Sequence, residues 1–201
     1  MKSTFKISAI ALAFAAFAFG AKAQTTSPAT TSTTTTPDGV RFSIGVDAGV
    51  PTGKFSDGYN WNLGGSLQAD IPVISNQLFV TVNAGYDNFF VKKNAVYVNG
   101  TPFQGDNIQL LPVKAGLKFF PAGSNFYIQG EAGAAFALNK SDLGYNNSAA
   151  FIWAPQIGYV FPLGGQSYID AGVRYQSSSD FITNDNYSKV SLFGLRVAYG
   201  F

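Results

Sequence analysis

The sequence predicts an all-β protein, an eight-stranded antiparallel up-and-down barrel, and three observations lead to this prediction. Apolar residues recur at every second position in eight segments of about ten residues each. The connections between these segments are alternately short and long. Glycines gather on one face of the segments and aromatic residues on the other.

The eight segments have the period of two that is typical of β-strands. They are residues 40–50, 59–71, 78–87, 111–119, 126–138, 151–161, 169–176 and 192–201. Pro112 and Pro155 fall inside segments, and a closed barrel has no free edge for a residue without an N–H group. We therefore expect β-bulges at both prolines. The sixth segment is the least regular, because Ile152 and Val160 occupy its polar phase.

The connections fall into two classes. Residues 72–77, 121–125 and 162–166 are short and rich in Pro, Gly and Asn, as tight turns are. The other four are longer and polar, at about 51–58, 88–106, 139–148 and 178–187. Short turns at one end and long loops at the other are typical of barrels that span a membrane.

The N-terminal region has the features of a secretory signal peptide in residues 1–23. Lys2 and Lys6 precede an apolar run at 7–19, which is too short to span a bilayer as a helix, and an Ala-Lys-Ala cleavage site follows. An N-terminal membrane anchor is the alternative. Residues 24–38 are rich in Thr, Ser and Pro, which predicts a disordered tether, and residues 39–201 form the predicted barrel domain.

The apolar face of the strands can point inward, as in a soluble lipocalin-like barrel, or outward to lipid. Ten residues tilted by about 45° span roughly 23 Å, close to the ~25 Å apolar band of membrane barrels. The polar face collects glycine, as a crowded eight-stranded lumen requires. Aromatic residues of the apolar face gather towards both of its ends, as in the aromatic girdles of membrane barrels. Those near the loops are Tyr59, Trp61, Tyr86, Phe136, Phe151, Trp153 and Tyr175, and those near the turns are Phe119, Phe126, Phe161, Tyr199 and Phe201. These features predict a transmembrane barrel with its apolar face outward.

With this pattern the chain resembles the small Gram-negative outer-membrane β-barrels, OmpA-like and OmpX-like, over residues 39–201. The last strand is the most specific part, because a terminal aromatic residue preceded by alternating apolar ones resembles the signal read by the barrel-assembly machinery. The matching positions here are Leu195, Val197, Tyr199 and Phe201. The resemblance implies an outer-membrane protein with periplasmic termini, which we expect to be monomeric.

The polar face of the strands carries five basic and five acidic residues, which we expect to form a charge network in the lumen. They are Arg41, Asp47, Asp70, Asp87, Lys114, Lys118, Glu131, Asp170, Arg174 and Arg196. If the 121–125 turn places Phe119 opposite Phe126, Lys114 lies opposite Glu131, and Arg174 and Arg196 could share that carboxylate. The network is either a structural plug or a narrow ion path.

Residue types that the chain lacks exclude several functions. Without cysteine or histidine there is no Ser–His or Cys–His nucleophile and no usual structural zinc site, so we predict no enzyme, cofactor or metal. Asp180 and Asp185 are a weak candidate for a cation site, and a solvated loop is the default. Removing the three signal-peptide lysines from the 13 basic residues leaves ten against 11 acidic ones, and nothing suggests a nucleic-acid surface.

The long connection at 88–106 is the most distinctive exposed segment. Its aromatic and basic residues, with an Asn-Gly hairpin signal, suggest a ribbon that binds an extracellular partner or a loop that packs on its neighbours. The recognition candidates are Phe89, Phe90, Lys92, Lys93, Tyr97 and Phe103. The predicted function is non-enzymatic, in envelope integrity or surface recognition. A narrow porin and a soluble periplasmic ligand-binding barrel are the alternatives.

Overall fold

The computed structural model describes residues 39–92, 96–98, 101–103, 106–139, 147–181 and 188–201, without the side chains of 96–98 and 101–103. The predicted signal peptide and tether lie outside the described residues, as do Lys93 and Asp185. No helix among the described residues is long and apolar enough to cross a membrane.

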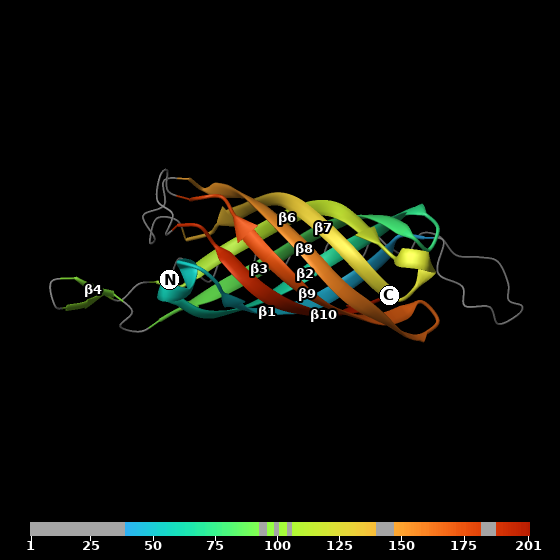
Figure 1. The fold of residues 1–201 in the computed structure, drawn as a ribbon, viewed down its shortest axis with the longest axis horizontal. Helices are drawn as coiled ribbons and strands as arrows, with labels where there is room; N and C mark the ends of the chain where they lie inside the picture. The colour runs from blue at the N-terminus through green and yellow to red at the C-terminus, as the bar shows by residue number, and fades with distance from the viewer. Residues whose placement is uncertain (1–38, 93–95, 99–100, 104–105, 140–146, 182–187) are drawn as a thin grey trace, which may run out of the picture. The chain divides into compact units, whose positions relative to one another are not determined.

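Eight strands close into a barrel (Figure 1). In chain order they are β1 (Arg41–Pro51), β2 (Tyr59–Ile74), β3 (Leu78–Val91), β6 (Ile108–Phe119), β7 (Phe126–Ala137), β8 (Ala149–Gly164), β9 (Ser167–Ser178) and β10 (Ser191–Gly200). Each strand pairs with the strands before and after it in this order, β10 closes on β1, and all pairs are antiparallel. The predicted eight-stranded up-and-down barrel is therefore confirmed.

The remaining elements are short and lie in the connections. They are the helix α2 (Phe55–Gly58), the 3-10 helix η1 (Pro121–Gly123) and a separate two-stranded ribbon of β4 (Val96–Val98) and β5 (Thr101–Phe103). The ribbon matches the hairpin that the Asn-Gly signal predicts. Figure 1 shows α2 and η1 at opposite ends of the barrel.

These two ends carry different connections, as the sequence predicts. We call the end with connections 52–58, 92–107, 138–148 and 179–190 the loop end, and the end with 75–77, 120–125 and 165–166 the turn end. Asn76 and Gly165 adopt positive φ angles of 65° and 60°, which tight hairpin turns require and which Asn and Gly tolerate best. The barrel strands extend past the predicted segments mainly at the loop end, where β3 continues to Val91.

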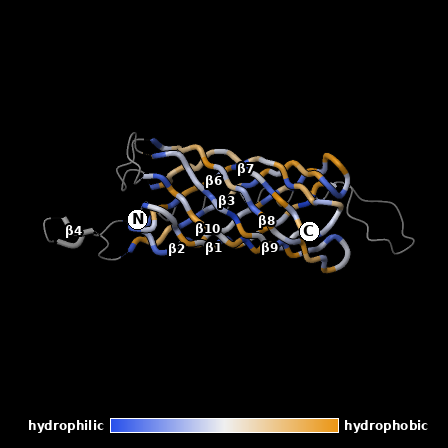
Figure 2. Tube along the Cα trace, in the orientation of Figure 1, coloured by the Kyte–Doolittle hydropathy of each residue, from blue (hydrophilic) through white to orange (hydrophobic). Residues whose placement is uncertain are grey.

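Buried and more exposed side chains alternate along the strands, and Figure 2 shows hydrophilic and hydrophobic residues alternating along the same strands. Each strand presents at least one large apolar side chain, between 42% and 59% exposed, on the outer surface: Val46, Leu63, Val82, Leu117, Ile128, Ile157, Val173 and Leu195. Every charged residue of the eight barrel strands is buried. The apolar face is therefore the outer face, and it continues around the whole barrel.

The predicted bulges at Pro112 and Pro155 are wrong. The register is unchanged on both sides of each proline, although the β3–β6 ladder lacks pairs between Ala84–Val113 and Asp87–Leu110. Pro112 still pairs with Ala135 on its other side. In an antiparallel sheet each N–H group bonds to only one neighbouring strand, so a proline interrupts one ladder and leaves the other intact. Register shifts occur instead near strand ends, between Tyr59 and Trp61, between Pro72 and Ile74, and between Pro162 and Gly164.

Candidate functional site: a charged and closed lumen

The lumen holds all ten charged residues that the sequence assigns to it, each at most 9% exposed. They come from every barrel strand except β8 and lie at different depths. Burying a charge in a narrow lumen is costly unless the charge is paired or hydrogen-bonded. The contacts of these residues therefore bear on whether the lumen conducts ions or is filled by paired charges.

Lys118 is the centre of a cluster in the half of the lumen nearer the turn end. Its Nζ lies 3.0 Å from a carboxylate oxygen of Asp70 and 2.6 Å from one of Asp170. The hydroxyl of Tyr127 donates a hydrogen bond of 2.6 Å to Asp170. The ammonium group also lies 4.3 Å from the centre of the Tyr127 ring. One fully buried lysine thus neutralises parts of two carboxylates that come from β2 and β9, two strands separated by β1 and β10.

Two further ion pairs lie nearer the loop end. Lys114 Nζ is 3.0 Å from Glu131 Oε2, and Thr81 donates a 3.3 Å hydrogen bond to the same carboxylate. Arg174 pairs with Asp47, which also accepts a 2.6 Å hydrogen bond from the hydroxyl of Ser66. Lys114 and Glu131 lie on the neighbouring strands β6 and β7, whereas Arg174 and Asp47 join β9 to β1 across the intervening β10.

The predicted Lys114–Glu131 contact forms, but the register that suggested it is wrong by two residues. Phe119 lies opposite Ile128 instead of Phe126, and Lys114 lies opposite Gly133. The lysine reaches Glu131 diagonally, because its long side chain spans one further pair along the strand. Neither arginine shares this carboxylate: within the described residues Arg174 and Arg196 form their ion pairs with aspartates.

Arg196 connects the two halves of the network. Its Nε donates to Ser66 at 3.1 Å, its Nη2 donates to Ser43 at 3.0 Å, and its Nη1 lies 3.8 Å from Asp170. Because Ser66 also bonds Asp47, the guanidinium links the Arg174–Asp47 pair to the Lys118 cluster. A guanidinium has five fixed donors and suits such a branching position.

A set of amide side chains completes the polar layer, and the sequence reasoning did not single it out. Gln68 donates to Asp70 at 2.6 Å, and its Oε1 accepts from Asn83 at 3.3 Å and from Gln129 at 3.4 Å. Gln156 donates to the Tyr127 hydroxyl at 2.5 Å. All four amides occupy inward positions of the alternation, which is the signal that could have found them.

A cluster of buried apolar side chains lies at each end of the described lumen, which the sequence did not predict. At the loop end, Phe55 of α2 and Phe181 of a connection pack with Phe89, Ile108, Leu110, Ala135, Ala150, Ile152, Val190 and Leu192. At the turn end, Phe120 packs with Phe79, Tyr127, Val160 and Tyr168. We call these sets the loop-end plug and the turn-end cap. Ile152 and Val160, which appear out of phase in the sequence, belong to β8 and contribute to the loop-end and the turn-end layer respectively.

Small inward residues make room for the large ones. A Cβ atom at Gly200 would lie 2.0 Å from the Tyr168 ring, and one at Gly158 would lie 2.4 Å from the ring and hydroxyl of Tyr127. In both cases the tyrosine is the cross-strand partner of the glycine. By contrast, the outward Gly130 has nothing within 4 Å of such an atom. This crowding explains why glycine gathers on the polar face.

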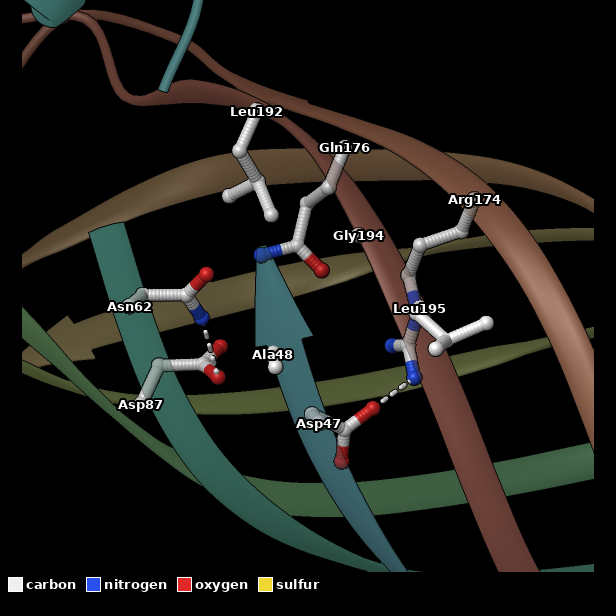
Figure 3. Close-up of a pocket in the computed structure, with 9 residues that line it drawn as sticks. All are labelled: Asp47, Ala48, Asn62, Asp87, Arg174, Gln176, Leu192, Gly194 and Leu195. Carbon is white, nitrogen blue, oxygen red and sulfur yellow. Dashed lines mark hydrogen bonds and ion pairs between the residues drawn. The ribbon is translucent and has the colours of Figure 1, made fainter. Parts of the chain in front are cut away.

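Two charged residues of the lumen have no ion pair within the described part of the chain: Asp87 near the loop end and Arg41 near the turn end. Arg41 places its guanidinium 4.3 Å from the centre of the Phe79 ring. Asp87 accepts a 3.2 Å hydrogen bond from Asn62. Beside Asp87 lies a pocket lined by Asp47, Ala48, Asn62, Asp87, Arg174, Gln176, Leu192, Gly194 and Leu195 (Figure 3).

The loop residues predicted for recognition lie in different surroundings. The prediction that Phe89 is exposed is wrong: it belongs to β3, faces the lumen and is 0% exposed in the loop-end plug. Phe90 faces outward and stacks on Trp61 with ring centres 4.4 Å apart. Lys92 is half-buried and donates to the Ser56 carbonyl at 2.7 Å. The side chains of Lys93, Tyr97 and Phe103 lie outside the described ones.

The predicted assembly-signal residues share the outer face of the last strand and the residue after it. Leu195, Val197, Tyr199 and Phe201 are all exposed, and the Tyr199 and Phe201 rings stack with centres 6.3 Å apart. Phe201 also exchanges two backbone hydrogen bonds with Phe42, which extends the closure of the barrel between β10 and β1. Within the described residues no group of three or more acidic side chains is arranged to hold a metal ion.

Comparison with known proteins returns barrels of similar architecture. No family model and no curated protein matches the chain. Among solved structures it is similar to the N-terminal β-barrel domain of Pseudomonas aeruginosa OprF, at 12% identity over 80% of this chain and 97% of that chain, with a TM-score of 0.48. It is also similar to the Yersinia pestis outer membrane protein Ail in a phospholipid bilayer nanodisc, at 16% identity over 80% and 99% of the two chains, with a TM-score of 0.49. The outer membrane protein AlkL is 14% identical over 89% and 95%, with a TM-score of 0.44. Likeness at these identities concerns the fold alone.

Proposed function

We propose that this chain is an integral outer-membrane β-barrel with a closed lumen, whose role is structural or exerted through its loop end, without transport or catalysis. The observation that carries the proposal is the combination of an apolar outer face on all eight strands with a lumen filled by paired charges. The outer face supports membrane insertion, and the filled lumen supports the absence of a pore.

A lipid environment accounts for the outer surface of the barrel. Water-exposed apolar patches on monomeric soluble proteins are usually a few hundred Å² in area, whereas here each barrel strand exposes large apolar side chains. A soluble lipocalin-like barrel would place these side chains inside. A basic residue facing lipid near the midplane would cost about 2–4 kcal/mol, and the strands place every charge in the lumen instead.

The predicted signal peptide and the last strand favour the bacterial outer membrane over other bilayers. Short turns are periplasmic in such barrels, so the turn end, where β1 begins and β10 ends, would face the periplasm and the loop end the cell exterior. The exposed face of Leu195, Val197, Tyr199 and Phe201 is the surface that the assembly machinery would read during insertion. These assignments rest on the sequence pattern together with the outward position of those residues.

The packing of the lumen favours a barrel that does not conduct ions over the alternative of a narrow porin. An ion crossing it would have to separate the Lys118 cluster and then displace apolar side chains at both ends. Moving an ion into surroundings without water costs several kcal/mol even after relaxation. The loop-end plug consists of apolar side chains, which would not replace the ion's hydration shell, and at the turn-end cap the cationic groups of Arg41 and Lys118 lie against the aromatic rings.

With the lumen closed, the loop end is the surface through which the protein can contact other molecules. The four long connections and the β4–β5 ribbon are the segments concerned, and the chain has no histidine or cysteine for a Ser–His or Cys–His nucleophile in them. The proposed role is therefore envelope integrity or surface recognition.

Fractionation of cells tests the membrane assignment. We expect the protein to sediment with outer membranes, to resist extraction by alkaline carbonate, and to migrate faster on a gel before heating than after. Release into the carbonate supernatant would contradict the proposal and favour a soluble periplasmic barrel.

A further inference from the structure

Two of the turn-end hairpins project beyond their neighbours in the barrel wall. Within the described residues, β2 pairs with β1 only up to Asp70, and residues 71–74 adjoin β3 alone. On its β7 side, β8 is bonded only up to Val160, and residues 161–164 adjoin β9 alone. Two strands separate the β2–β3 hairpin from the β8–β9 hairpin in each direction around the barrel, so the two lie on opposite walls (Figure 1).

The projecting parts of both hairpins are apolar and exposed. Val73 and Leu163 are each 58% exposed, which matches the 59% of Val46 in the middle of the outer face. Each lies two residues beyond an outward apolar residue, Ile71 on β2 or Phe161 on β8. The projecting parts therefore continue the apolar outer face of the barrel past its turn-end aromatic residues.

The apolar columns of these two strands are long enough to reach both edges of a membrane. At about 3.3 Å per residue and a tilt of about 45°, the outward residues from Trp61 to Val73 span about 28 Å, and those from Phe151 to Leu163 span the same length. The apolar band of outer-membrane barrels is about 25 Å tall. A band that starts at Trp61 and Phe151 therefore ends close to Val73 and Leu163.

The chemistry of the two tips also suits the edge of a bilayer. Residues 71–79 and 160–169 contain no charged side chain, and the turns at 75–77 and 165–166 consist of Ser, Asn, Gln and Gly, which are polar or small but uncharged. Pro72 and Pro162 have no N–H group, which reduces the number of backbone donors without a partner on the projecting strands. The third hairpin, at 121–125, has no large apolar side chain.

We propose that the β2–β3 and β8–β9 hairpins are two apolar anchors that insert into the leaflet on the turn-end side of the membrane. Val73, Ile74 and Leu163 lie among the acyl chains next to the headgroups, and the uncharged turns lie among the headgroups. Lipid is the occupant because these residues continue the face that the rest of the barrel presents to lipid. The inference rests on the proposed function, since it requires an inserted barrel.

Two anchors on opposite walls hold the turn end against the leaflet and set the depth of the barrel in the membrane. The η1 hairpin lies between them around the barrel and stays in water. A partner that approaches from the periplasm therefore meets the η1 hairpin and not the two apolar tips.

Single cysteines test the depth of the hairpins, because the chain has no cysteine of its own. Val73→Cys and Leu163→Cys are labelled with an environment-sensitive fluorophore and refolded as the mature chain into phosphatidylcholine vesicles. Some of the lipids carry a nitroxide quencher either near the headgroup or near the end of the acyl chain. Val46→Cys, on the outer face, and Ser124→Cys, in the η1 hairpin, are controls at exposed positions. Heat-shifted mobility verifies that each variant has folded.

We expect the shallow nitroxide to quench Val73→Cys and Leu163→Cys more strongly than the deep one does, Val46→Cys to show the opposite order, and Ser124→Cys to be quenched little by either. Quenching at position 73 or 163 that is no stronger than at 124 would overturn the proposal of two anchors. An unquenched Val46→Cys would instead contradict the proposed function. If a labelled variant does not refold, the exposed Ile74 or Pro162 is replaced by cysteine in its stead.

Discussion

Replacing Lys118 with methionine should be the most damaging single change to the charge network. The substitution keeps most of the side-chain volume and removes one positive charge that lies 3.0 Å from Asp70 and 2.6 Å from Asp170. The two carboxylates then keep as nearby bases Arg196, at 3.8 Å from Asp170, and Arg41, the cross-strand partner of Asp70. The substitution therefore breaks two buried ion pairs and leaves the carboxylates of Asp70 and Asp170 buried without the lysine that neutralised them.

The expected loss of unfolding free energy is about 3–5 kcal/mol, the range for breaking a buried pair. Because two carboxylates lose their lysine, we expect the upper half of that range, which corresponds to a fall of roughly 1–2 M in the urea midpoint for a chain of this size. Tryptophan fluorescence reports unfolding, because Trp61 and Trp153 both lie on the outer face of the barrel. Urea titration of the protein refolded into lipid vesicles is the assay.

Two comparisons isolate the cause. Lys189→Met removes a lysine from an exposed position in a connection and should change the stability by less than about 0.5 kcal/mol. Adding Asp170→Asn to Lys118→Met removes one of the two carboxylate charges that have lost their lysine and should restore part of the lost unfolding free energy. A midpoint for Lys118→Met equal to that of Lys189→Met would refute the view that the lumen is held together by its ion pairs.

Three further predictions concern other parts of the barrel. Gly200→Ala should destabilise by about 1–3 kcal/mol, because its Cβ would lie 2.0 Å from the Tyr168 ring, whereas Gly130→Ala, in open space, should be neutral in the same urea titration. Val197→Arg, on the lipid face of β10, should cost about 2–4 kcal/mol in vesicles, and an unchanged midpoint would contradict lipid contact at that face. Deleting Phe201 should slow membrane insertion in cells, measured as a delayed appearance of the heat-shifted band, and normal kinetics would exclude the terminal aromatic residue as an assembly signal.

The period of two was sufficient to predict the strands, their outer and inner faces and the burial of all ten charges. This pattern works because lipid outside and a narrow lumen inside impose opposite demands on successive residues. The Lys114–Glu131 contact was also predicted, but from a register that is two residues off. Register depends on turn geometry, and the η1 turn contains Ala122 in a left-handed conformation. Alanine does not favour this conformation, so the residue type gives no signal that would predict it.

The loop-end plug and the turn-end cap could not be predicted, because the same apolar residue types serve the lipid face. Ile152 and Val160 appeared as irregularities of the sixth segment, although they are inward residues placed where the lumen meets its two ends. Phe89 was assigned to an exposed loop for a related reason. Alternation continues through β3 to Val91, and inward aromatic residues at the end of a strand look like loop residues when the lumen is assumed to be polar throughout.

Single-channel recording of the refolded mature chain in a planar bilayer tests the closed lumen most directly, with Glu131→Ala recorded beside it. The account predicts no steady conductance from wild-type protein whose insertion is shown by its heat-shifted mobility. Glu131→Ala, which leaves Lys114 without its 3.0 Å partner but keeps both apolar layers, should be equally silent and less stable in urea. Steady, reproducible conductance that changes in Glu131→Ala would contradict the account and show that the charged lumen is an ion path.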